Sequence, residues 1–131
     1  MKRSFIGSMN GVAKMLLCSV LVMLGVMSAH GQATVTATGL GPGPTVYTTL
    51  RLAFNAINAG THTGTITISI TGNTTETATA VLNASGSGSA SYTSIAIAPS
   101  GGAARTISGA ITAGSPLIDL NGADNVTIDG L

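Results

Sequence analysis

Residues 48–71 of the chain read TTLRLAFNAINAGTHTGTITISIT, and the period of the apolar residues changes within this stretch. In the first half, apolar side chains recur at intervals of three and four residues, which predicts an amphipathic helix over residues 48–58. Its apolar stripe consists of Leu50, Ala53, Phe54 and Ile57. Thr48 or Thr49 can cap the first turn, and the run Asn-Ala-Gly at residues 58–60 is a typical helix end.

The second half of the same stretch alternates between apolar and hydroxyl side chains. Ile66, Ile68 and Ile70 share one face of a strand predicted over residues 65–71, because successive side chains of a strand point to opposite faces. Further short strands are expected over residues 34–38, 77–82, 92–98, 105–111, 116–120 and 125–131. The Gly/Ser run at residues 85–89 is predicted to be a flexible loop. The fold class indicated by these elements is all-β.

The spacing of the isoleucines and leucines suggests that the strands recur. Ile68 and Ile97 are 29 positions apart, Ile97 and Leu120 are 23 apart, and Ile107 and Ile128 are 21 apart. Strands that recur every twenty-odd residues suit a solenoid of stacked coils. They also suit a β-sandwich of short hairpins, and the spacing alone leaves both architectures open.

The N-terminal quarter of the chain has a different composition. Three of the five basic residues lie within the first fourteen positions, an apolar run follows over residues 15–27, and small residues come next. This order predicts a secretory signal peptide over residues 1–33 with cleavage after Ala33, while cleavage after Ala29 or Gly31 stays open. The run is shorter than the roughly 20 residues of a spanning helix. Cys18 lies inside the run after Leu17, which is not the position of a lipidated cysteine.

Removal of the signal peptide leaves a chain without Cys, Met, Lys or Trp. This part contains two arginines, four acidic residues and 19 threonines. The formal net charge of this part is −2. The near absence of cationic residues excludes a nucleic-acid binder of the basic-patch kind. The low charge also excludes a highly charged disordered tail. The lack of Cys excludes a disulfide framework.

Few residues are candidates for chemistry. Asp119, Asp124 and Asp129 are spaced by five and form the one catalytic or Ca²⁺-binding candidate. Aspartate at turns is more often explained by hydrogen bonds to the backbone. His62, which has no His or Cys neighbour, is predicted to be an exposed loop residue. Glu76 is expected to bond at a turn. We therefore assign no catalytic, metal-binding or cofactor-binding residue and expect no cofactor.

The other polar candidates are interpreted as structural. Arg51 and Arg105 are too few to form an anion clamp. Three Asn residues begin an N-glycosylation acceptor pattern, and the high Asn and Thr content explains these matches by chance. They are Asn73, Asn83 and Asn125. The glycines at positions 39, 41 and 43 lack the strand and helix that flank a phosphate-binding loop.

Several segments resemble the start of a known fold. Residues 47–58 resemble the N-terminal capping helix of right-handed parallel β-helix proteins of the pectin-lyase-like superfamily. In that superfamily a strand like residues 66–70 follows, and then a Gly-x-x-x-Glu step, which is here residues 72–76. Residues 121–131 are similar to a typical coil of the same fold. The part after the signal peptide also resembles the opening of large secreted surface proteins of Bacteroidetes-type bacteria.

The resemblance implies the start of a right-handed parallel β-helix of two to three coils, as a fragment of a longer solenoid. The capping helix would bury the first coil's apolar face and cover its open edge. The implied organisation is a signal peptide over residues 1–33, a strand and Gly/Pro linker over 34–45, and the helix and first coils over 46–131.

The resemblance also implies a function. This would be the non-catalytic N-terminal part of an exported extracellular or cell-surface protein, acting in adhesion, glycan contact or as a stalk. Its partners would be extracellular glycans or cell-surface components, with no nucleic acid and no membrane after signal cleavage. The alternatives are the N-terminal end of a secreted polysaccharide lyase or glycoside hydrolase with its active site beyond residue 131, and a small secreted β-sandwich module.

Overall fold

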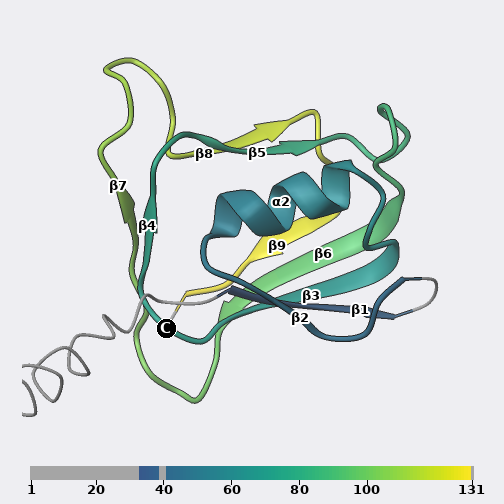
Figure 1. The fold of residues 1–131 in the computed structure, drawn as a ribbon, viewed down its shortest axis with the longest axis horizontal. Helices are drawn as coiled ribbons and strands as arrows, with labels where there is room; N and C mark the ends of the chain where they lie inside the picture. Colours follow the sequence, from purple (N-terminus) through teal and green to yellow (C-terminus); the bar gives the residue numbers. More distant parts are fainter. Residues whose placement is uncertain (1–32, 39–40, 131) are drawn as a thin grey trace, which may run out of the picture.

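The computed structural model of the chain describes residues 33–38 and 41–130, which are mostly β-strands with one short helix (Figure 1). The all-β fold class is therefore confirmed. The expected signal peptide lies outside the described residues, apart from Ala33. The described part of the chain contains no helix that is long and apolar enough to cross a membrane.

Nine strands and one helix make up the described chain. The helix is α2, Leu50–Asn58. The first strands are β1 (Ala33–Thr38), β2 (Thr45–Tyr47), β3 (Gly64–Ile70) and β4 (Thr74–Glu76). The remaining strands are β5 (Ala80–Asn83), β6 (Tyr92–Pro99), β7 (Ile107–Gly109), β8 (Ile118–Asn121) and β9 (Val126–Ile128). Strands β2 and β4 have no counterpart among the predicted strands.

The strands pair in three parallel ladders that follow one another in a fixed order along the chain. Strand β3 pairs with β6, which pairs with β9. Strand β4 pairs with β7, and β5 pairs with β8. Strands β3, β4 and β5 point in three different directions, and we call them the first circuit of the chain. Strands β6, β7 and β8 form the second circuit and lie beside them in the same order (Figure 1).

The ladder registers correct the predicted repeat length. Ile68 pairs with Ile97, so the 29-residue spacing does join stacked positions. The spacings of 23 and 21 residues do not, because Ile97 pairs with Ile128 while Leu120 pairs with Leu82 in a different ladder. A β-sandwich of hairpins would place strands that are consecutive in the sequence side by side in antiparallel pairs, which none of these three ladders does.

Antiparallel pairing between named strands occurs at the N-terminal edge. Strand β1 pairs antiparallel with both β2 and β3, so β1 occupies the edge of β3 opposite β6. The predicted arrangement gave this edge to the helix, whereas the structure covers it with β1. Ala33 is already paired with Tyr47 and Ile70, so the expected boundary after Ala33 falls one residue inside the strand.

The helix covers the interior of the first circuit. The Thr49 side chain accepts a hydrogen bond from Leu52 N and so caps the helix, as one of the two predicted threonines. The helix ends where predicted: Gly60 N bonds to Ile57 O and Thr61 N to Ala56 O, the two bonds of a Schellman ending. All four residues of the predicted apolar stripe are buried. In Figure 1 the helix lies within the outline that β3, β4 and β5 form.

The inward side chains stack from circuit to circuit, and their exposure rises with distance from the helix. Leu82 is completely buried, whereas Leu120, its partner in the next circuit, is 41% exposed. Ile97 is 2% exposed, and its partner Ile128 is 50% exposed. The stack is thus closed by α2 at one end and presents apolar side chains at the other.

Candidate functional site

The most deeply placed charged group of the described chain is Glu76, at the end of β4. Its side chain is 1% exposed and points into the stack. Leu50 N donates to Glu76 Oε1 at 2.9 Å, and Arg51 N donates to Oε2 at 3.1 Å. The carboxylate thus binds two of the amide groups that a helix leaves unpaired in its first turn, where the helix dipole also favours negative charge. The expectation that Glu76 bonds at a turn is wrong, because the residue belongs to a strand.

The backbone around Glu76 is also tightly packed. Gly109 in β7 lies beside Glu76 in the ladder. A Cβ atom at Gly109 would lie only 2.5 Å from the Glu76 carbonyl oxygen, so no larger residue fits without movement of the strand. This packing holds β7 close to the backbone of Glu76.

The C-terminal end of α2 is attached to the first circuit by Asn58. Its Nδ2 atom donates to Val81 O at 2.9 Å, and Asn83 N donates to its Oδ1 atom at 3.0 Å. The amide therefore satisfies one acceptor and one donor on the edge of β5 that faces away from β8. In the next circuit Asn121 Nδ2 donates to Asn83 Oδ1, so Asn83 contacts Asn58 through its backbone and Asn121 through its side chain.

We expect Asn58→Ala to lower the free energy of unfolding by about 2 kcal/mol, because the variant leaves two partly buried backbone groups without partners. Asn55→Ala is the matched control. Asn55 is exposed on the same helix, so its replacement should change stability by less than about 0.5 kcal/mol. Denaturant unfolding of both variants measures the difference. Equal losses would show that the Asn58 amide does not hold the helix.

His62 is buried, which contradicts the predicted exposed loop position. Its side chain is 0% exposed, and Nε2 lies 2.9 Å from the Tyr47 hydroxyl. The two rings meet edge to face, with centroids 5.9 Å apart. The Nδ1 atom is buried and has no hydrogen-bond partner. Burial lowers the pKa of His62 below its ordinary value and raises the pKa of Tyr47. The loop is covered because the segment at Gly41 packs against Thr61.

The three aspartates of the catalytic candidate are spread over the far end of the stack. Asp119 lies in β8 opposite Val81, Asp124 lies in the connection between β8 and β9, and Asp129 follows β9. Within residues 33–38 and 41–130, no group of three His, Cys, Asp or Glu residues is suited to hold a metal ion. These aspartates therefore remain separate side chains in the described structure.

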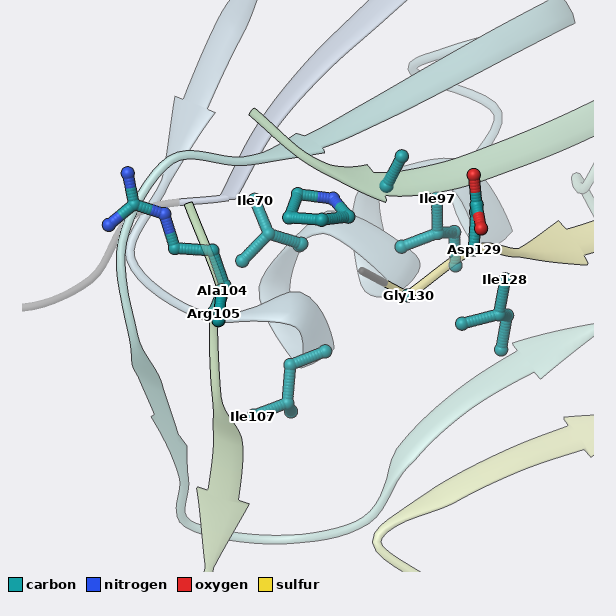
Figure 2. A pocket seen from close by; sticks show the side chains of 10 residues that line it. Ile70, Ile97, Ala104, Arg105, Ile107, Ile128, Asp129 and Gly130 are labelled. Carbon is teal, nitrogen blue, oxygen red and sulfur yellow. The ribbon is translucent and has the colours of Figure 1, made fainter. Parts of the chain in front are cut away.

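An apolar hollow of about 200 Å³ lies beside the last circuit. Isoleucines from successive circuits line it, namely Ile70, Ile97, Ile107 and Ile128. The charged residues that line it are Arg105 and Asp129. Figure 2 shows the Arg105 side chain extending away from the isoleucines. The hollow lies between the ends of β3, β6 and β9 and the start of β7, and few polar groups there could orient a substrate.

Two of the three Asn residues in acceptor patterns have structural hydrogen bonds. Thr106 N donates to Asn73 Oδ1 at 3.0 Å, and Asn83 accepts from Asn121 as described above. Asn125 adopts a positive φ of 57°, which Asn tolerates better than most residues. Their positions are thus explained by turns and contacts between circuits.

Comparison of the chain with protein-family models, with curated proteins and with solved structures finds no match.

Proposed function

We propose that the chain is the N-terminal part of an exported right-handed parallel β-helix protein, and that this part has a structural, non-catalytic role. The observation that carries the proposal is the repeated order of the parallel ladders, in which β6, β7 and β8 lie beside β3, β4 and β5. The right hand follows from the general rule that crossovers between parallel strands of one sheet are right-handed in about 98% of cases.

The two unequal ends of the stack support a role as the beginning of a longer array. Repeat arrays need a terminal cap because an uncapped end exposes both apolar side chains and unpaired strand edges. Here α2 covers the apolar interior, and β1 pairs with the edge of β3. Leu120 and Ile128 at the other end occupy inward positions and are exposed, so a further layer of apolar side chains would fit there.

The hydrogen bonds of the polar side chains next to α2 support a stalk or adhesion part over an enzyme. The side chains of Glu76 and Asn58 both form hydrogen bonds with backbone groups, and these bonds hold the helix in place. The outward positions of β3 and β6 are small and uncharged, as at Thr67 and Ala96. Such a surface suits lateral contact with extracellular glycans or other cell-surface components.

Export gives a direct test of the proposal. We expect the protein in the medium or on the cell surface, without its first residues, when a producing culture is fractionated. Mass spectrometry of the N-terminus distinguishes the cleavage positions. Cleavage after Gly31 would keep Ala33 paired in β1, whereas cleavage after Ala33 would remove the first paired residue. A chain found in the cytosol with Met1 intact would refute export.

A further inference from the structure

His62 lies in a part of the molecule that offers no counter-charge. The segments around it, residues 33–38, 41–49, 59–75 and 84–95, contain no Asp, Glu, Lys or Arg. The charged residue of α2 is Arg51, which lies beside Glu76 in the first turn, roughly 10 Å along the helix axis from its last residue. The titratable group that contacts the imidazole is the Tyr47 hydroxyl.

A neutral imidazole can be accommodated in this place and a protonated one cannot. In the neutral tautomer that carries its proton on Nε2, this nitrogen donates to the Tyr47 hydroxyl, and Nδ1 has no N–H group that needs an acceptor. Protonation makes both nitrogens donors, and Nδ1 then carries a buried N–H group without an acceptor. An unpaired buried charge is costly, so an imidazolium would be stable only if it reached water.

The weakest cover over His62 is the segment that ends in β2. Strand β2 has three residues, pairs with β1 alone and forms the edge of the five-stranded sheet. The neighbouring helix α2 and first circuit are held by inward apolar residues, among them Phe54, Ile57 and Ile66, that are 0% exposed. Opening of residues 41–47 therefore exposes the imidazole at a lower cost than opening of the stack.

We propose that His62 and Tyr47 form an acid-sensitive latch that holds residues 41–47, with strand β2, on the edge of the sheet. Protonation of His62 releases this segment and leaves β1 as the new edge strand. The backbone groups of β1 that pair with Tyr47, Val46 and Thr45 in the closed form then become available to another strand.

The sign of the pH dependence follows from linkage. Because the folded-state pKa of His62 lies below the ordinary value of 6.5, the closed form is favoured above that value. This preference is lost as the pH falls from 6.5 towards the lowered pKa. The largest effect that one proton can have is a tenfold change in the opening equilibrium per pH unit, or about tenfold between pH 7.5 and 5.5.

Hydrogen exchange of the full chain, followed by mass spectrometry, tests the latch. After correction for intrinsic exchange rates, we expect protection of residues 41–47 to fall about three- to tenfold from about pH 7.5 to about pH 5.5. Protection of β6 should change by less than about twofold, because the stack stays closed. In His62→Gln, whose Gln side chain does not titrate, the protection of residues 41–47 should no longer depend on pH. Tyr47→Phe should have lower protection at both pH values and keep the response.

Several outcomes would overturn the latch. An unchanged pH response in His62→Gln would show that another group is responsible, and a parallel loss of protection in β6 would show global unfolding. Constant protection in the unmodified chain would also refute it. If His62→Gln does not fold, the His62 ring protons of the unmodified chain can be followed by NMR. Their titration midpoint must then coincide with the midpoint for opening of residues 41–47, and a mismatch refutes the latch.

Discussion

Replacement of Glu76 by alanine should lower the free energy of unfolding by about 3–5 kcal/mol. The carboxylate accepts two charge-assisted hydrogen bonds from Leu50 N and Arg51 N, each worth about 1.5–3 kcal/mol. The variant leaves the buried Leu50 amide without an acceptor and removes a favourable charge from the start of the helix. Because small domains are stable by only about 5–15 kcal/mol, this loss approaches the total stability.

Equilibrium denaturation of two further variants separates the hydrogen bonds from the volume of the side chain. Glu76→Gln keeps the shape and one acceptor oxygen, so it should lose about half as much stability as Glu76→Ala. Thr75→Ala changes the neighbouring outward side chain and should stay within about 0.5 kcal/mol of the parent. If Glu76→Gln is as stable as the parent, the negative charge and the second acceptor oxygen do not contribute to the anchoring of α2.

Elements with a regular spacing of apolar residues could be predicted from the sequence alone. The stripe of α2 and the alternation of β3 depend on side chains that must be buried together, so their periods are visible without the fold. Strand β4 was missed because two of its three residues, Thr74 and Glu76, point inward and are polar. A polar residue at an inward position gives no hydrophobic signal, although it marks the place where a buried amide needs a partner.

The long-range relations were harder to predict. The spacing of 29 residues between Ile68 and Ile97 does join stacked positions, because both residues lie within long strands that pair with each other. The connections between the ladders differ in length, so Leu82 and its partner Leu120 are 38 positions apart. The burial of His62 was also not predictable from the local pattern. The segment that covers it is distant in sequence and contains mostly Gly and Pro.

The stacked pair Leu82 and Leu120 provides the second large effect and its own control. Leu82→Ala should lower the free energy of unfolding by about 3–5 kcal/mol, as expected for a fully buried leucine. Leu120→Ala removes the same atoms from the same ladder one circuit later, where the side chain is 41% exposed. Its loss should be about 1 kcal/mol, because less apolar surface returns to water and no closed cavity forms.

The difference between these two losses measures how completely the far end of the stack is covered. In the 131-residue chain we expect the larger loss at Leu82 in urea denaturation, with unchanged dependence on urea concentration. If a further apolar layer stacks on Leu120 in the exported protein, as the proposed β-helix requires, Leu120→Ala in that protein should become as destabilising as Leu82→Ala. Equal losses already in the 131-residue chain would mean that Leu120 is covered there, and the proposed open end would be wrong.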